Sequence, residues 1–152
     1  MALTSGDLLA FMRRHRLAVE ASVSSTAAPQ AAVVGIAVTD RFEIVFDTIA
    51  STRKAKNLGR NPRIAFVIGG LHDGDERTVQ YEGIADEPSG DELERLTRAY
   101  YQVYPDGPSR LAWPGLIYVR VQPTWIRYSN FSTNPPEIVE FGVGDLAPAS
   151  SL

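Results

Sequence analysis

Hydrophobic and polar positions alternate along much of this chain, which is typical of β-strands with one buried face. The pattern predicts strands at Leu17–Val23, Ala31–Val38 and Phe42–Asp47. The second of these runs is almost entirely apolar, so we expect it to be covered on both faces. Gly35 within it either marks a bulge or leaves room for a flat group to lie against the backbone.

The alternation continues through the rest of the chain. It predicts strands at Ile64–Ile68 and Arg77–Ala85 and, later, at Leu116–Gln122 and Thr124–Tyr128, the last two separated by a proline. A proline lacks the N–H group that a central strand needs, so we expect a break there. Ile138–Phe141 is expected to add a short edge strand.

Apolar residues recur every three to four positions in three other segments, which indicates helices. The first helix is expected to begin near residue 5, the second to span Thr52–Gly59, and the third to run from 89 to 104. Ser89 and Glu92 have the spacing of a capping box at the start of the third helix.

Together these elements predict a mainly β fold. Six principal strands joined by hairpins suggest an antiparallel β-barrel, closed or nearly closed, with flanking helices. Side chains fill a barrel of this size, so a ligand would have to lie outside it. We see no repeat and no second domain, and we divide the chain into a single domain at 1–141 and a C-terminal tail at 142–152.

Composition excludes several kinds of site. The 152 residues include no cysteine, which leaves no disulfide framework, thiol nucleophile or thiolate metal site. The two histidines, His15 and His72, lack the neighbours of a catalytic triad or a metal centre. The acidic balance argues against nucleic acid as a partner. Without a membrane-spanning run or a signal-peptide pattern, we expect a cytoplasmic protein with no membrane partner.

Positive charge is concentrated in one window of this acidic chain. From Thr48 through His72 there is no acidic residue, and the five cations of this window are Arg53, Lys54, Lys56, Arg60 and Arg63. Since the net charge is -3, the rest of the chain carries -3 - 5 = -8. A local positive field on an acidic protein indicates an anionic small ligand.

Within this window, Arg53 and Lys54 fall in the first turn of the predicted second helix, after a cap at Ser51 or Thr52. The N–H groups of a first turn lack helical partners and the helix dipole is positive there, so cations are disfavoured unless an anion binds. The pattern therefore predicts a phosphate-binding site. Lys56 and Arg60, at helical spacing, point away from the core side of this helix.

The same stretch resembles a known motif. Phe46-Asp47-Thr48, Thr52-Arg53-Lys54-Ala55 and Asn61-Pro62-Arg63 resemble the FMN-binding split-barrel superfamily of pyridoxamine 5'-phosphate oxidase, and the similarity runs from about Leu17 to Asn130. The resemblance implies a six-stranded antiparallel split β-barrel of the FMN-binding type. It implies a homodimer with the cofactor at the interface, FMN in most members and the deazaflavin F420 in some.

The resemblance also implies roles for individual residues. It assigns the cofactor phosphate to Thr48, Thr52, Arg53 and Lys54, and we add Ser51 from the same hydroxyl-rich turn. It places the flavin ring against the backbone of the second strand, at Ala32, Val33, Val34 and Gly35, with Asp47 at the edge of the next strand. It leaves Thr78 or Gln80 to approach the ring, and Tyr128 of a second subunit to close the site.

The chain departs from the true oxidase where that enzyme holds its phosphorylated substrate. Tyr100 is present, but Tyr104 and Pro108 stand where the oxidase has an arginine and a serine, and Ala32 replaces a phosphate-binding arginine. The C-terminal Arg-x-His of the oxidase is also missing. Each charged contact contributes about 1.5–3 kcal/mol, so we expect vitamin B6 oxidation not to be the activity.

The sequence thus predicts an FMN-binding flavoprotein, an oxidoreductase acting on an unidentified small molecule. The residues include no acid–base or nucleophile set, so the chemistry would belong to the cofactor, and the catalytic residues stay unassigned. Two alternatives stay open: a flavin-binding carrier, sensor or stress protein without turnover, and an F420-dependent reductase.

Overall fold

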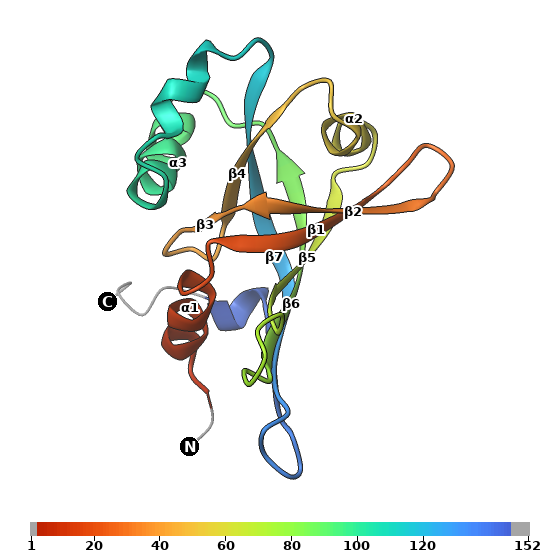
Figure 1. Ribbon diagram of the computed structural model, residues 1–152, viewed down its shortest axis with the longest axis vertical. Helices are drawn as coiled ribbons and strands as arrows, with labels where there is room; N and C mark the ends of the chain where they lie inside the picture. The colour runs from red at the N-terminus through yellow and green to blue at the C-terminus, as the bar shows by residue number, and fades with distance from the viewer. Residues whose placement is uncertain (1–2, 147–152) are drawn as a thin grey trace.

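The computed structural model describes residues 3–146, which form a curled antiparallel sheet flanked by helices (Figure 1). The strands are β1 (Leu17–Val23), β2 (Pro29–Gly35), β3 (Ala37–Val38), β4 (Ile44–Ile49), β5 (Arg63–Gly69), β6 (Arg77–Asp86), β7 (Leu116–Asn130) and β8 (Glu137–Gly142). The helices are α1 (Ser5–Arg13), α2 (Arg53–Arg60), α3 (Gly90–Val103) and the 3-10 turns η1 (Gly107–Ala112) and η2 (Val143–Leu146). None of the helices in this part of the chain is long and apolar enough to cross a membrane.

The sheet closes through one continuous stretch of chain. Its strand order is β2-β1-β5-β6-β7-β4-β3, with β8 added beside β7. The two ends of this order, β2 and β3, follow each other in sequence with only Ile36 between them. One stretch therefore pairs with β1 at one end and with β4 at the other, which makes the expected mainly β split barrel.

Aromatic side chains fill the interior of the barrel. Phe66 packs edge to face against both Phe46 and Tyr81, with ring centroids 6.1 and 5.7 Å apart. The Tyr81 hydroxyl donates to the carbonyls of Phe42 and Val121, so its buried polar atom is satisfied. This packing leaves the outside of the barrel for a ligand, as the sequence predicts.

The break expected at Pro123 does not occur. Strand β7 runs through it, and the register with β6 shifts between Glu82 and Gly83, opposite the proline. A Cβ at Gly83 would come within 2.5 Å of the Gln122 carbonyl, so glycine allows the two backbones to approach here. The β-bulge absorbs the missing N–H group without ending the strand.

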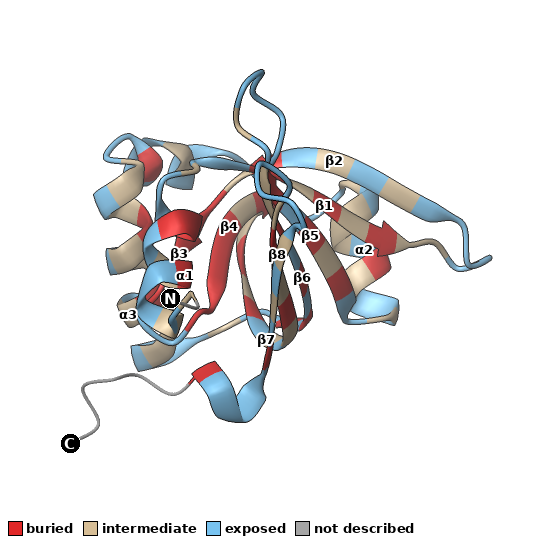
Figure 2. Cartoon of the chain, turned by 90° about the horizontal axis from the view of Figure 1, so that it is seen from below, coloured by how far each residue is buried: buried red, intermediate tan, exposed pale blue. Residues whose placement is uncertain are grey.

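The second strand is not covered on both faces in the single chain. Exposed positions alternate along β2 with intermediate ones and the buried Val34 (Figure 2), and Val33 is 63% exposed. The strand forms one end of the sheet and projects with β1 beyond the barrel (Figure 1). Its apolar composition therefore leaves an uncovered face.

Of two predicted helix caps, the one at Thr52 is present and the one at Ser89 is not. Thr52 caps α2, because its hydroxyl accepts from the Ala55 N–H at 3.3 Å. Ser89 precedes α3 but its side chain makes no capping bond. Glu92 instead accepts hydrogen bonds from Arg95 and Arg120, at 2.8 and 2.9 Å, so ion pairing replaces the capping box.

The described start of the predicted tail is part of the folded chain. Gly142 ends β8, and η2 follows with Leu146 buried against the core. The remainder of the predicted tail, 147–152, lies outside the described residues.

Candidate cofactor-binding site

The N-terminus of α2 is held directly against the end of β4. The Ala50 N–H donates to the Gly115 carbonyl at 2.7 Å, and the Thr52 N–H donates to the Ile49 carbonyl at 3.0 Å. The hydroxyls of Thr48 and Thr52 lie 3.2 Å apart and share a hydrogen bond. Thr48 is buried behind the cap, so it supports the helix start from within.

Asn57 fixes the other side of α2 to the β1–β2 hairpin. Its amide group donates to the Ser22 hydroxyl at 3.0 Å and to the Gln30 side-chain oxygen at 2.8 Å. It is the buried residue of this helix, whereas Gly59, which we would expect on the core side from its spacing, is exposed. Little in the sequence indicated that Asn57 is buried, apart from its position next to Leu58, which packs against the core.

Between α2 and the hairpin lies a groove of about 450 Å³. Its lining residues are Glu20, Ser22, Gln30, Ala31, Ala32, Ser51, Thr52, Arg53 and Lys54. The structure therefore brings together five residues that the sequence assigned to the cofactor, namely Ala32, Ser51, Thr52, Arg53 and Lys54. They come from three segments: β2, the turn after β4, and the first turn of α2.

The cations of the groove have no anionic partner within the described part of the chain. No carboxylate of residues 3–146 lies within ion-pair distance of Arg53 or Lys54, although seven arginines elsewhere form such pairs: Arg13, Arg77, Arg95, Arg98, Arg110, Arg120 and Arg127. The backbone N–H groups of Arg53 and Lys54 also find no protein acceptor among these residues. Unpaired N–H groups and cations at a helix N-terminus form an anion-binding site.

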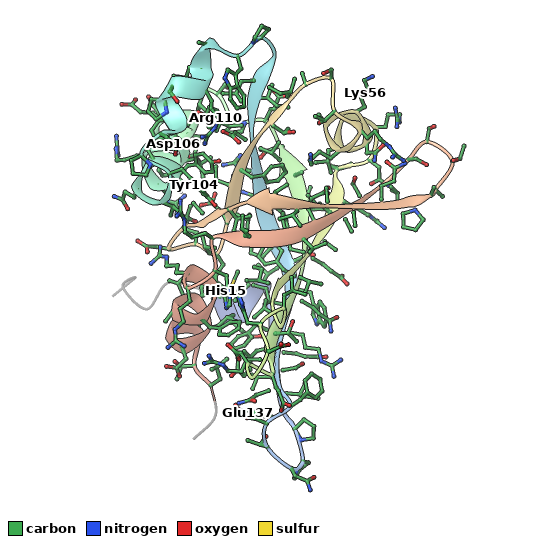
Figure 3. The ribbon with its side chains drawn as sticks, in the orientation of Figure 1. His15, Lys56, Tyr104, Asp106, Arg110 and Glu137 are labelled. Carbon is green, nitrogen blue, oxygen red and sulfur yellow. The ribbon has the colours of Figure 1, made fainter. Side chains whose placement is uncertain are left out.

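Lys56 provides a contrast on the same helix. It is exposed, does not line the groove, and points away from the strands on the outer side of α2 (Figure 3). Arg60 donates to the Asn57 side-chain oxygen at 3.0 Å, which directs it away from the first turn as well.

Glu20 is a groove residue that the sequence analysis missed. It lies on β1 directly across from Ala32, is 1% exposed, and its Oε2 atom has no hydrogen-bond partner among the described residues. Burial raises the pKa of the Glu20 carboxyl, and the positive charge of Lys54 partly opposes the rise. The sequence pattern places Glu20 on the polar face of β1, opposite the apolar Val19 and Ala21. The structure buries the other face, with Ala18, Glu20 and Ser22, so the alternation gave no signal for this residue.

Asp47 lies elsewhere, in a cluster on the α3 side of β4. The Arg110 guanidinium donates to Asp47 at 2.7 Å and to Asp106 at 2.8 Å, and both members of the Asp47 pair are largely buried. Figure 3 shows Arg110 and Asp106 beside α3, across β4 from α2. The Asp47 carboxylate is therefore paired with Arg110 and does not line the groove at α2.

Gly35 is explained by the chain's own packing. A Cβ there would lie 2.6 Å from the Tyr104 hydroxyl, and that hydroxyl donates to the Arg16 carbonyl. The flat group against this backbone is therefore a tyrosine from the end of α3. The neighbouring Val34 faces the core and Val33 faces solvent, so neither lines the groove.

The remaining predicted residues also lie away from the groove. Thr78 is close to Gly70 at the far end of β6. Gln80 is the direct neighbour of Val67 and lines a small depression on the outer face of the sheet, together with Val19 and Val67. Tyr128 is 4% exposed, and its ring packs at 86° against Phe11 with centroids 5.6 Å apart. Since this ring is buried in its own core, it offers no surface to a second subunit.

The outer face of the sheet carries an uncovered apolar row. Val19 of β1 is the direct neighbour of Val33 on β2 and of Val67 on β5, so the three side chains share one face. Val33 and Val67 are exposed. Ala31, two residues before Val33 and hence on the same face, lines the groove, so the apolar face and the groove are continuous.

The histidines lie far from this groove in the fold. His15 packs against the Phe11 ring at 4.8 Å, and its Nε2 atom is buried without a partner near Gly69. Burial lowers the pKa of His15. His72 is exposed in the turn between β5 and β6, and neither histidine lines the groove at α2.

Comparison with known proteins agrees with this fold. Residues 5–130 match the profile of the family described as pyridoxamine 5'-phosphate oxidase. A heme-binding protein from Mycobacterium smegmatis is 14% identical with a TM-score of 0.81, covering 97% of this chain and 61% of that one. The chain thus spans about three fifths of that protein's length.

Two further solved structures are similar over most of their length. HutZ, a heme storage protein from Vibrio cholerae, is 15% identical with a TM-score of 0.67, covering 81% of this chain and 91% of that one. A pyridoxamine 5'-phosphate oxidase-related, FMN-binding protein from Nostoc punctiforme is 13% identical with a TM-score of 0.65, covering 84% and 80%. No curated protein matches the chain by sequence.

Proposed function

Because the chain belongs to the pyridoxamine 5'-phosphate oxidase family, we propose that it binds FMN with the phosphate in the groove at α2. We propose further that it is an oxidoreductase acting on a small molecule, in the cytoplasm. FMN would supply the redox chemistry, and the chain would supply binding and orientation.

One observation carries the proposal. Arg53 and Lys54 stand without an anionic partner in the described chain, beside free N–H groups and the hydroxyls of Ser51 and Thr52. This donor set fits a phosphate, since it combines two full positive charges with a helix N-terminus. An anion that binds here therefore gains contacts that no acidic side chain of the described residues takes up.

The substrate of the true oxidase fits the chain poorly. Tyr100 is buried and stacks on Tyr104 with ring centroids 4.9 Å apart, and Tyr104 is held by the Arg16 carbonyl. These side chains are used for packing at the positions where the oxidase grips a phosphorylated substrate. We therefore propose a substrate other than a vitamin B6 phosphate.

Three alternatives can be examined in the same titrations. A flavin carrier or sensor would bind FMN without turnover, and an F420-dependent reductase would use the same phosphate contacts. The third alternative, a heme-binding protein, is suggested by the names of two similar structures. It is less well supported, because the groove has no histidine and the Nε2 of His15 is buried.

A homodimer completes the proposed site. A flavin ring leaving the groove past Ala31 would lie over the apolar row formed by Val33, Val19 and Val67. Ligand sites bury most of the ligand, and the single chain offers only one wall. A second copy placed on this face by a two-fold axis would cover both rings and both apolar rows.

Titration with FMN tests the proposed site. Arg53→Ala and Lys54→Ala should each weaken FMN binding by about 1.5–3 kcal/mol, because each removes a charged contact to the phosphate. Lys56→Ala is the matched control on the same helix and should change the affinity little. Equal weakening by all three variants would reduce the site to a diffuse positive field, and uptake of heme but not FMN, seen in the absorbance spectrum, would overturn the proposal.

Sedimentation tests the shared site. The FMN-bound protein should be a dimer with about one flavin per chain. Val33→Glu places a charge on the apolar row and should shift the protein to monomer, while the exposed Leu71→Glu, in the β5–β6 turn, should not. A monomer that holds FMN as tightly as the unmodified protein would contradict the shared site.

A further inference from the structure

Among the residues that line the groove, Glu20 alone has a buried polar atom without a partner. Ser22 and Gln30 are satisfied by the Asn57 amide group. The Oε2 of Glu20 has no hydrogen-bond partner among the described residues, and Lys54 is close enough to act on its charge without forming an ion pair. Buried acceptors are almost always paired in folded proteins, so a partner from outside the chain is expected.

The chemistry of a carboxylate limits what this partner can be. An ionised carboxylate only accepts hydrogen bonds, and a phosphate is also an acceptor with the same sign of charge. A phosphate held by Arg53 and Lys54 therefore cannot satisfy an ionised Glu20. The ligand must bring a hydrogen-bond donor to this wall of the groove, next to its phosphate.

The strand beside Glu20 narrows the ligand further. Ala32 is the direct cross-strand neighbour of Glu20, so the two side chains lie side by side on the same face, and that of Ala32 is a methyl group. A chain that crosses this face from the phosphate thus meets an apolar side chain and one carboxylate. A hydroxylated carbon chain suits this surface, because its carbons pack on Ala32 while one hydroxyl donates to Glu20.

We propose that Glu20 is a specificity residue that accepts a hydrogen bond from a hydroxyl of a polyol chain attached to the bound phosphate. This rests on the proposed function, since the phosphate contacts of Arg53 and Lys54 set the position of the chain. The ligand class is a polyol phosphate, and the ribityl phosphate of FMN is one member. Glu20 thereby separates such ligands from simple phosphates.

Calorimetric titration with two small phosphates tests the assignment. Ribitol 5-phosphate and pentyl phosphate have the same chain length and differ only in the hydroxyls. The unmodified protein should bind ribitol 5-phosphate more tightly by about tenfold, the effect of a hydrogen bond to a charged group. Glu20→Leu should abolish this preference, and Glu20→Gln, which keeps an oxygen acceptor without the charge, should retain part of it.

Several outcomes would overturn the role of Glu20. An unchanged preference in Glu20→Leu would show that another group reads the hydroxyl. Equal tightening of both phosphates in Glu20→Leu would make Glu20 a repelling charge only, and equal weakening would make it a proton donor to the phosphate. Thermal unfolding of the empty variants confirms that they fold, and Glu20→Gln preserves the shape if Glu20→Leu does not fold.

The same titrations separate this proposal from the FMN proposal. If FMN fails to bind while Glu20→Leu loses the preference for ribitol 5-phosphate, Glu20 keeps its role and FMN is the wrong polyol phosphate. If FMN binds and requires Arg53 but the preference is unaffected, the site is right and the role of Glu20 is wrong. If none of the three compounds binds, both proposals fall.

Discussion

Two buried glutamates of this barrel differ sharply in their surroundings. Glu20 on β1 is 1% exposed and Glu43, just before β4, is 3% exposed. Glu43 accepts a hydrogen bond from the Thr39 hydroxyl at 2.8 Å and two from the Arg95 guanidinium at 2.9 Å each. Glu20 has no such partner for its Oε2 among the described residues.

The difference also shows in how readily each carboxyl loses its proton. Burial alone would raise the pKa of Glu43, but hydrogen bonds from Arg95 and Thr39 outweigh it and lower the pKa. For Glu20 burial prevails and the pKa is raised. Glu43 links α3 to the barrel through its hydrogen bonds with Arg95. Glu20 makes no such link through its Oε2 atom, and we propose that a ligand hydroxyl binds it. Burial by itself does not distinguish these roles.

The largest expected effect on stability comes from replacing Glu43. Glu43→Gln should destabilise the protein by about 1.5–3 kcal/mol, because it removes the charge that accepts two hydrogen bonds from Arg95, which keeps Glu92 as its remaining partner. Urea unfolding measures this. Glu94→Gln is the control, since the exposed Glu94–Arg98 pair should contribute less than about 0.5 kcal/mol. A loss at Glu43 as small as at Glu94 would show that the Glu43–Arg95 contacts do not stabilise the fold.

A smaller change in stability, of opposite sign, is expected from replacing Glu20. Glu20→Gln should stabilise the empty protein at neutral pH by up to about 1 kcal/mol, because it removes a buried charge without a hydrogen-bond partner. The same unfolding experiment measures it. A clear loss of stability would mean that Glu20 has a structural partner in solution and does not differ from Glu43 in this respect.

The two variants should respond to pH in opposite directions. The pKa of Glu20 is raised above its ordinary 4.5, so the contribution of Glu20 to stability is fully present below pH 4.5 and is lost as pH rises through the folded value. The pKa of Glu43 is lowered from 4.5, so its stabilisation is present above 4.5 and is lost as pH falls through the folded value. In acid, the gain from Glu20→Gln and the loss from Glu43→Gln should both shrink, as unfolding in a pH series would show.

The smallest effect is expected from the groove cations in the empty protein. Arg53→Ala should change the stability by less than about 0.5 kcal/mol, because Arg53 is exposed and has no ion-pair partner in residues 3–146. With FMN present the same variant should lose much of the ligand-induced rise in melting temperature. A large loss without FMN would make Arg53 a structural residue.

The sequence by itself determined the features that depend on local pattern. The alternation places β1 at Leu17–Val23 as observed, and Thr52, Arg53 and Lys54 mark the start of α2 with their charges at the helix terminus. These features follow from residues close together in the chain, whose periodicity and capping chemistry act over a few positions. The groove residues at the start of α2 were therefore within reach of the sequence.

Only the tertiary structure decided which distant side chains meet. Asp47 pairs with Arg110, 63 positions later, and Asn57 binds Ser22, 35 positions earlier. The opposite fates of Glu20 and Glu43 likewise depend on whether a distant arginine reaches them, as Arg95 reaches Glu43. Periodicity placed both glutamates on the polar face of their strands, although the structure buries them. Their burial and their partners are set by strand register and helix docking, which no local pattern contains.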